Sequence, residues 1–246
     1  MPLRPAYPAP PPAAPPHPVI RAIARPFLAV DGVSASHGNV SALAEVSLEV
    51  RAHELLALTG SNGSGKSTLL SVLAGTHEMS SGQRKDTWAD GSAISAQNGG
   101  ARLRIAFVVQ RSAVSDTFPL TARGAVQMGR WGERGSWRPL TITDRRIVAD
   151  SIQALGLTGL ESRPLASLSG GQRQRVFVAQ GLAQQADVLL LDEPTVGLDD
   201  HARDLIHQAM AAEVRRGAAV VIATHDADVI AAADRVIHLA RGEIAT

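Results

Sequence analysis

The chain has 246 residues, of which 45% are apolar and 19% charged, a composition typical of a folded domain rather than a disordered chain. Lysine and arginine (24) nearly balance aspartate and glutamate (23), so no strong overall field holds nucleic acid, and we expect no nucleic-acid partner. Cysteine is absent, which excludes disulfides, a thiolate nucleophile and Cys-ligated metal sites.

The N-terminal segment is rich in proline: ten of the fourteen prolines lie within the first 26 residues. Proline disrupts helices and cannot donate to a sheet ladder, so we predict that residues 1–25 form a disordered or polyproline-II tail. An inert extension is the simpler interpretation, and a segment that binds a proline-recognising partner is the alternative. Residues 26–246 are predicted to form one folded domain.

From residue 27 onward, short apolar runs alternate with helical patterns. Wholly apolar runs suit parallel strands covered on both faces, and their alternation with helices is typical of a doubly wound α/β sheet. The expected strands are 55–59, 105–109, 188–191 and 219–223, the expected helices are 67–74, 175–184 and 201–215, and a hairpin is expected at 236–244. Residues 78–103 are polar and predict a long surface loop, and residues 111–168 predict a mainly helical lobe.

A phosphate-binding pattern follows the first of these strands. The residues Gly60-Ser61-Asn62-Gly63-Ser64-Gly65-Lys66-Ser67-Thr68 fit G-x-x-x-x-G-K-[ST] between a strand and a helix. Glycines let backbone N–H groups wrap around phosphates, and the helix that follows adds its positive N-terminal end. We expect Lys66 to contact the β- and γ-phosphates of a nucleotide and the Ser67 hydroxyl to ligate Mg²⁺.

Two carboxylates end the apolar strand 188–191. Asp192 and Glu193 therefore lie at the carboxyl edge of the predicted sheet, where such folds bind their ligands. We expect Asp192 to hold Mg²⁺ through water and Glu193 to polarise the water that attacks the γ-phosphate. Alone, the two acids would equally suit a helix cap, and the phosphate loop favours the catalytic interpretation.

Further motifs make the chain resemble the ATP-binding cassette (ABC) ATPases over about residues 27–246. The segment Leu168-Ser169-Gly170-Gly171-Gln172 matches the family's signature motif, Gln110 its Q-loop glutamine, Gly197-Leu198-Asp199 its D-loop, and Thr224-His225-Asp226 carries its switch histidine. The resemblance implies an α/β fold, a P-loop NTPase of ABC type. Its core would be a mostly parallel sheet, joined by an antiparallel β subdomain and a helical subdomain.

The same resemblance implies how the motifs act. Gln110 would help Ser67 and Asp192 to organise Mg²⁺, and His225 would contact the γ-phosphate beside Glu193. Signature residues Ser169, Gly170 and Gly171 precede a helix, and helix N-termini attract anions. In the family they close, with Gln172, over the ATP of a second copy of the chain, in a dimer that buries two ATP molecules. Asp199 would then lie at the dimer seam.

One position departs from the family's pattern. Family members usually carry an aromatic residue, often tyrosine, ahead of the phosphate loop, where the ring stacks on adenine. His37 occupies that place in this chain. An imidazole offers less stacking area than a phenol ring, so we expect somewhat weaker nucleotide affinity.

The resemblance also indicates a membrane partner. The segment after Gln110, up to and including Leu168 of the signature, has only 58 residues (111–168). That is too few for the long coiled-coil insertion of DNA-repair relatives. The chain carries one cassette and no run of 18 apolar residues. The resemblance therefore indicates a separate ATPase subunit that serves an integral membrane permease through the lobe 111–168. An extracytoplasmic substrate-binding protein would act indirectly. We therefore expect peripheral attachment to the cytoplasmic face of the cell membrane.

The substrate is the least specified feature. The stretch ending in Met128-Gly129-Arg130-Trp131 and the run Gln180-Gly181-Leu182-Ala183 look most like zinc- and manganese-type importer cassettes. We expect import of a divalent metal ion, with an iron-siderophore, haem or cobalamin importer as the alternative. A soluble, non-transport ABC ATPase is a rival, as is a non-hydrolysing nucleotide-gated module, although Glu193 and His225 argue against the latter. Phe118, Met128 and Trp131 are candidate permease contacts or ordinary packing residues.

Overall fold

The computed structural model of the chain describes residues 26–86, 103–110, 120–134 and 138–245. Its central element is a sheet of six strands in the order β5-β6-β7-β3-β8-β9. The strands are β3 (Leu55–Thr59), β5 (Ile105–Val108), β6 (Val188–Asp192), β7 (Ala219–Ala223), β8 (Arg235–Ala240) and β9 (Glu243–Ile244). The first five in that order run parallel, and β9 closes antiparallel on β8. The predicted strands and the predicted hairpin are confirmed.

A second sheet is antiparallel, with the order β2-β1-β4. It consists of β1 (Pro26–His37), β2 (Val40–Arg51) and β4 (Ser81–Asp86). The expectation of a loop throughout 78–103 is therefore wrong for β4, and residues 87–102 lie outside the described part of the chain. Strand β4 carries mostly polar side chains because it pairs at an edge of the sheet, through its backbone, with β1.

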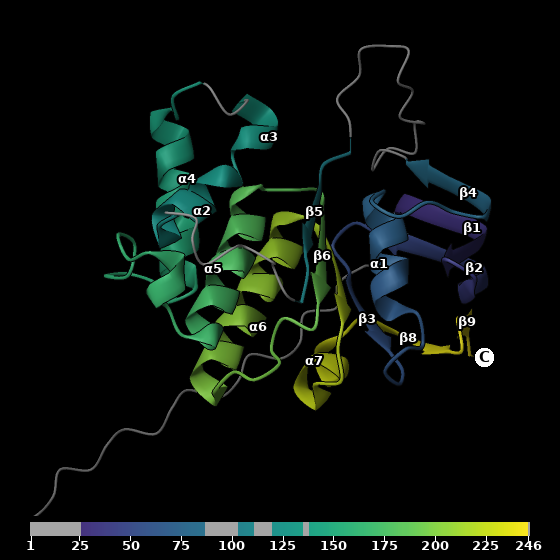
Figure 1. The fold of residues 1–246 in the computed structure, drawn as a ribbon. Coiled ribbons are helices and arrows are strands. Elements are labelled where there is room, and N and C mark those ends of the chain that lie inside the picture. Colours follow the sequence, from purple (N-terminus) through teal and green to yellow (C-terminus); the bar gives the residue numbers. More distant parts are fainter. Residues whose placement is uncertain (1–25, 87–102, 111–119, 135–137, 246) are drawn as a thin grey trace, which may run out of the picture.

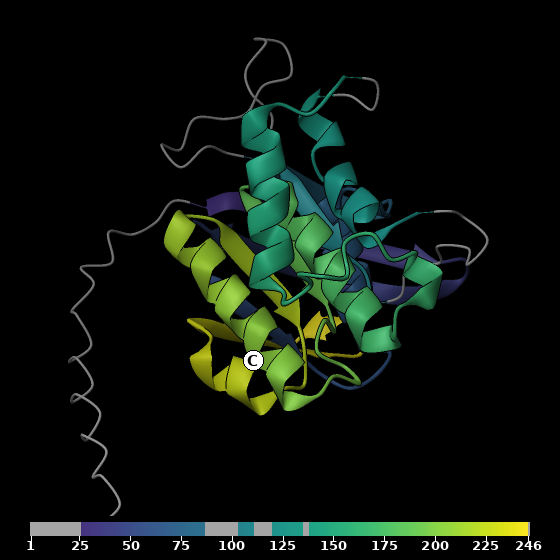
Figure 2. The same ribbon diagram turned by 90° about the vertical axis from the view of Figure 1, so that its left-hand side faces the viewer.

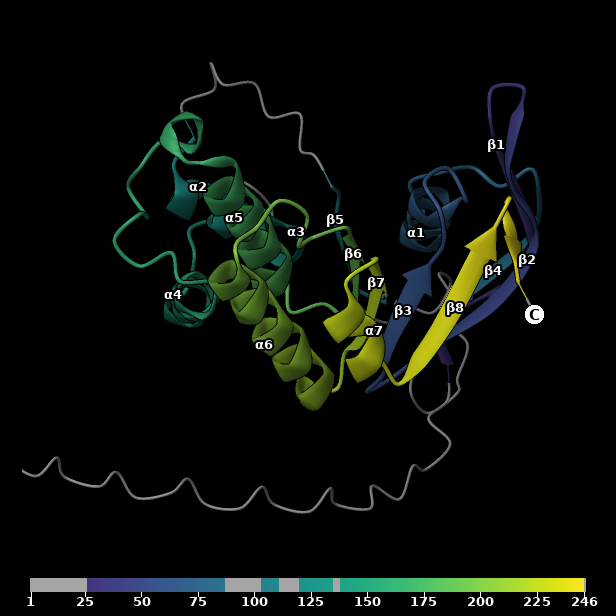
Figure 3. The same ribbon diagram turned by 90° about the horizontal axis from the view of Figure 1, so that it is seen from below.

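Alternate residues of the central strands face two separate cores. In β6, Val188 and Leu190 join a core with the antiparallel sheet and helix α1 (Lys66–Ala74). Leu189 and Leu191 join a second core with α5 (Gly170–Ala183), α6 (Asp200–Arg216) and α7 (Ala227–Ala232). Both faces of the sheet are thus covered, which explains why β3, β6 and β7 are almost wholly apolar. Figures 1 and 3 show α1 on one side of this sheet and α5 and α6 on the other.

Helices make up most of the described part of 111–168. They are α2 (Ala122–Met128), α3 (Trp131–Arg134), α4 (Ile142–Ala154) and a 3₁₀ helix (Leu165–Ser167). Apolar side chains from α2, α4 and α5 share one core, and the three helices pack together (Figures 1 and 2). None of the helices in the described ranges is long and apolar enough to cross a bilayer.

A buried ion pair joins three of these helices. Arg130, which follows α2, donates from Nε to Asp144 of α4 over 3.1 Å, and both side chains are almost fully buried. A second guanidinium nitrogen donates to the carbonyl oxygen of Ala183 at the end of α5, 2.9 Å away. Arg130, which was expected within a stretch that contacts the permease, therefore holds the helices of the lobe together. Of its neighbours, Trp131 is 41% exposed, Met128 is half-buried, and Phe118 lies outside the described residues.

Candidate functional site

The loop between β3 and α1 follows a path that only glycine permits at two positions. A Cβ atom on Gly60 would lie 2.2 Å from the carbonyl oxygen of Leu239 in β8, and one on Gly65 would lie 2.5 Å from that of Ala42 in β2. Both glycines also have positive φ angles, 140° and 105°, which L side chains avoid. The loop is therefore wedged between β8 and β2, and its shape is set by the fold.

Lys66 is the first residue of α1, and its side chain turns back over this loop. The ammonium donates to the carbonyl oxygens of Gly60, at 2.8 Å, and Ser61, at 3.1 Å, and the residue is only 8% exposed. The hydroxyl of Ser64 is buried without a hydrogen-bond partner among the described residues. A cation and an unsatisfied hydroxyl thus line a loop that opens onto a helix N-terminus, which suits phosphate.

Asp192 ends β6 close to this loop and is 6% exposed. Burial raises the pKa of its carboxyl, and a hydrogen bond from Ser67 and the charge of Lys66 act in the opposite direction. Its Oδ1 is buried with no hydrogen-bond partner among the described residues. An unsatisfied carboxylate oxygen beside a serine hydroxyl is a set of hard oxygen donors, so these residues fit Mg²⁺.

Glu193 and His225 approach each other from neighbouring strands. The backbone of Glu193 is left-handed, with φ 47°, and its N–H donates to the carbonyl oxygen of Ala223 at the end of β7, 3.0 Å away. Nδ1 of His225 lies 3.0 Å from Oε2 of Glu193, although the orientation is not that of a hydrogen bond. The Glu193 side chain is 11% exposed and that of His225 is 77% exposed. The nearly buried carboxylate of Glu193 therefore has the solvent-exposed imidazole of His225 beside it.

Gln110 lies two residues beyond β5, the strand next to β6, and its side chain is exposed. Because β5 and β6 are parallel, the residues that follow them lie at the same edge of the sheet. The structure thus gathers the phosphate loop, Gln110, Asp192, Glu193 and His225 along one edge.

His37, at the end of β1, shares a hydrogen bond of 3.1 Å with the hydroxyl of Thr68 in α1. Its ring also lies against that of His77, with centroids 4.5 Å apart and planes tilted by 54°. A ring nitrogen of His77 in turn lies 3.2 Å from the carbonyl oxygen of Ser36. No sequence pattern indicates a role for His77, because a single histidine between a helix and a strand matches no motif.

The signature residues form the N-terminus of α5. Ser169 caps the helix by accepting from the N–H of Gln172 at 3.2 Å, and the Gln172 side chain accepts from the N–H of Ser169 at 3.0 Å. This reciprocal pair is a capping box. It starts the helix at Gly170, five residues before the expected start at 175.

The D-loop lies next to the signature. A Cβ atom on Gly171 would lie 3.0 Å from the Leu198 side chain, and Asp199 caps α6 by accepting from the N–H of Ala202 at 2.7 Å. Both segments belong to the helices that cover the face of the sheet opposite α1 (Figure 3). The structure therefore does not place Ser169, Gly170, Gly171, Gln172 or Asp199 with the phosphate loop of the same chain.

Comparison with known proteins agrees with this geometry. The family model described as ABC transporter matches residues 43–196. A hemin import ATP-binding protein of Streptomyces coelicolor is 39% identical over 99% of this chain and 82% of its own length. A chelated iron transport system protein of Yersinia pestis is 37% identical over 85% of this chain and 69% of its own length. For a manganese transport system ATP-binding protein of Synechocystis the values are 35%, 83% and 77%.

Solved structures of ABC transporter cassettes also resemble this chain. A bacterial ABC transporter cassette solved as a dimer superposes with a TM-score of 0.75 at 26% identity, covering 89% of this chain and 97% of that one. A metal-chelate type ABC transporter in an inward-facing conformation superposes with a TM-score of 0.74 at 26% identity, covering 90% and 82%. The chain therefore belongs to the ABC transporter family, as an ATP-binding cassette that hydrolyses ATP.

Proposed function

We propose that this cassette powers the import of a divalent metal ion, zinc or manganese, through a membrane permease. Manganese transport proteins of three organisms, 31–35% identical, support a metal ion as the substrate. The metal-chelate type transporter among the solved structures supports a permease partner. A substrate-binding protein outside the membrane would deliver the ion, and the cassette would sit peripherally on the cytoplasmic face.

Hydrolysis is assigned to the edge where the motifs meet. Lys66 and the N–H groups of residues 60–68 bind the phosphates, and Glu193 accepts the proton of the attacking water. His225 contacts the γ-phosphate and orients that water relative to Glu193. The 3.0 Å approach of His225 to Glu193, at the end of two adjacent strands, is the observation that carries this assignment.

Mg²⁺ belongs to the same site. Ser67, Gln110 and Asp192 would hold it, and its charge would offset that of the β- and γ-phosphates when it is bound. The buried, unsatisfied Oδ1 of Asp192 supports this assignment.

The second half of the site would come from another copy of the chain. The signature and Asp199 lie on the helices opposite α1, so they serve a partner's phosphate loop rather than their own. Residues 26–246 then form the cassette, with residues 1–25 as a tail and the lobe at about 111–168 contacting the permease. His37 would stack on adenine, as its contact with Thr68 supports. Higher ATP affinity in His37→Tyr would agree with this, and unchanged affinity would not.

A haem importer is the second candidate. The hemin import protein of Streptomyces coelicolor matches 99% of this chain, more than the manganese relatives do. Its identity to the chain, 39%, is also higher than theirs. Haem and metal ions are delivered to the permease by other proteins, so the cassette's own residues do not distinguish them.

Cells that carry Lys66→Ala test the substrate. The variant should lose nucleotide binding, and source cells grown under chelation should then lose zinc or manganese relative to the parent. The matched control is Lys85→Ala, because Lys85 is the other lysine of the chain and lies exposed on β4, 3.7 Å from Asp31.

Elemental analysis of both strains, and growth on haem as the sole iron source, give the readouts. Selective loss of zinc or manganese in Lys66→Ala alone supports the proposal. Failure to grow on haem, with normal zinc and manganese, favours the second candidate. Unchanged metals and unchanged haem use, without a second uptake route, contradict both.

A further inference from the structure

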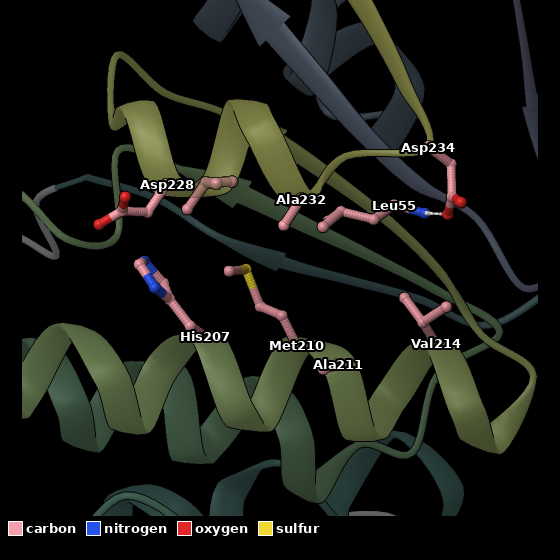
Figure 4. A pocket seen from close by; sticks show the side chains of 9 residues that line it. Leu55, His207, Met210, Ala211, Val214, Asp228, Ala232 and Asp234 are labelled. Carbon is pink, nitrogen blue, oxygen red and sulfur yellow. Dashed lines mark hydrogen bonds between the residues drawn. The ribbon is translucent and has the colours of Figure 1, made fainter. Parts of the chain in front are cut away.

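A cavity of about 200 Å³ separates α6 from α7, at the end of the loop that carries His225. Figure 4 shows His207 on α6 pointing across this space toward the first turn of α7, where Asp228 lies. Further along α6, Met210 and Val214 face the same space, below Ala232 of α7. Most of this lining is apolar, so a polar contact across it stands out.

That contact joins His207 to Asp226. Nε2 of His207 lies 3.3 Å from Oδ2 of Asp226, and the side chains are 24% and 9% exposed. Nε2 is buried and makes no hydrogen bond with any described residue, so its polar contact is this close approach to the carboxylate. Oδ1 of the same carboxylate caps α7 by accepting from the N–H of Asp228 at 3.1 Å. Asp226 is thus held on one side by α7 and on the other by α6.

Asp226 follows His225 directly, and its own N–H donates to the hydroxyl of Thr224 at 3.0 Å. His225 itself is 77% exposed, so packing does little to fix its ring. The residues on either side, Thr224 and Asp226, are the anchors that set where the imidazole stands relative to Glu193.

We propose that His207 is a positioning residue for hydrolysis: through Asp226 it holds the loop Thr224–Asp226 against α6 and thereby keeps His225 beside Glu193. Val229 attaches α7 to the apolar core that it shares with Met210 of α6, and the polar contact acts on the loop that precedes α7. Because Asp199 caps α6, the contact also ties this loop to the helix that starts at the proposed dimer seam. The inference rests on the role proposed above for His225.

Four variants of the full chain test it. His207→Leu replaces the imidazole with an apolar side chain of similar volume, and His207→Gln retains an N–H donor. Asp226→Ser keeps a good helix cap but has too short a side chain to reach His207. Met210→Leu is the matched control, because it changes another lining residue with little change in volume.

The measurements are kcat and KM for ATP and the midpoint of thermal unfolding. We expect His207→Leu to lower kcat about fivefold while KM changes less than about twofold, because the phosphate loop is untouched. Its unfolding midpoint should not fall, since leucine buries apolar surface there. His207→Gln should recover most of kcat, and Met210→Leu should match the parent. The His207→Leu/Asp226→Ser pair should be no slower than the slower single variant, because both act on one contact.

The outcomes separate this inference from the assignment of His225. If His225→Ala abolishes hydrolysis and His207→Leu keeps the parental kcat, the inference is wrong and the assignment stands. A fall in kcat that is matched by a lower unfolding midpoint, or multiplied in the double variant, also overturns it. If His225→Ala itself hydrolyses at the parental rate, the assignment of His225 fails and the inference fails with it.

Discussion

Asp192 is a buried acid whose ionised form destabilises the fold, and its proposed role in the site explains why the residue is there. Its carboxyl is 6% exposed, its pKa is raised by burial, and its Oδ1 lacks a hydrogen bond among the described residues. A folded-state pKa above that of the unfolded chain means that the ionised carboxylate opposes folding. The penalty is present above the raised pKa and disappears as the pH falls below the value in the unfolded chain.

Asp192→Asn should therefore stabilise the chain without nucleotide by about 1 kcal/mol at pH 8, because it removes a buried charge. The gain should shrink as the pH is lowered through the raised pKa of the parent carboxyl, since that group then takes up a proton. Urea unfolding across this range measures it. Asp204→Asn is the control, because Asp204 is exposed on α6. A gain that does not vary with pH, or a loss at pH 8, would contradict this account of the site.

Glu193 has an unusual left-handed backbone conformation just after β6. A non-glycine residue in this conformation is uncommon and strained, and here the strain aims a nearly buried carboxylate toward His225. Glutamine has the same shape but cannot accept the proton of water. The backbone and the carboxylate chemistry can therefore be tested apart.

Glu193→Gln should bind ATP as the parent does and hydrolyse it at least about a hundredfold more slowly, because it lacks the general base. It should accumulate as a dimer with ATP bound. Phosphate release, ATP binding and light scattering on the same preparation give the three readouts. Hydrolysis at the parental rate would show that another group is the base.

At the scale of elements, the helical lobe depends on the buried pair Arg130–Asp144. The pair links the end of α2 to α4, and Arg130 also reaches α5. Asp144 has a second task, since its side chain accepts from the N–H of Thr141 at 3.0 Å to complete a capping box. Removing one partner would leave the other charge buried among apolar side chains.

Arg130→Met should lower the free energy of unfolding by about 3 kcal/mol, as expected for breaking a buried ion pair. The exposed pair Arg146–Asp150, on the same helix α4 at 3.9 Å, provides the control. There Arg146→Met should cost less than about 0.5 kcal/mol. Denaturant unfolding of both variants gives the comparison, and equal losses would mean that the buried pair has no special role.

The elements differ in how much the sequence predicts of them. Strands β3, β6 and β7 were predicted because short, almost wholly apolar runs suit a covered parallel sheet. Strand β4 was missed because its polar residues carry no such pattern and its pairing with β1 is a backbone contact. The start of α5 was placed too late because glycines at 170 and 171 disfavour a helix, and the Ser169–Gln172 capping box overrides that preference.

The site follows the same rule. The phosphate loop, Asp192, Glu193 and His225 were predicted because each lies in a local motif beside a strand. The contacts His37–His77 and His207–Asp226 were not, since each joins residues far apart in the sequence with no motif around them. Their existence depends on how the elements pack, which a pattern of single residues does not record.

At the scale of the whole molecule, each chain carries two half-sites that face different ways. The phosphate loop begins α1 on one face of the central sheet, and the signature begins α5 on the other (Figure 3). In the proposed dimer, two copies related by a two-fold axis bring each half-site against the complementary half of its partner. The solved cassette dimer, with a TM-score of 0.75 to this chain, has the same fold.

Complementation between two inactive variants tests this arrangement most directly. Lys66→Ala destroys the phosphate half-site and keeps the signature. Ser169→Asp keeps the cap of α5 and places a negative charge against the partner's γ-phosphate. In a mixed dimer, one complete site forms from the two intact halves. An equimolar mixture should recover about a quarter of the parental hydrolysis, because about half of the dimers are mixed and each has one of two sites. Each variant alone should remain inactive. A mixture as inactive as its components would contradict a site shared between two chains.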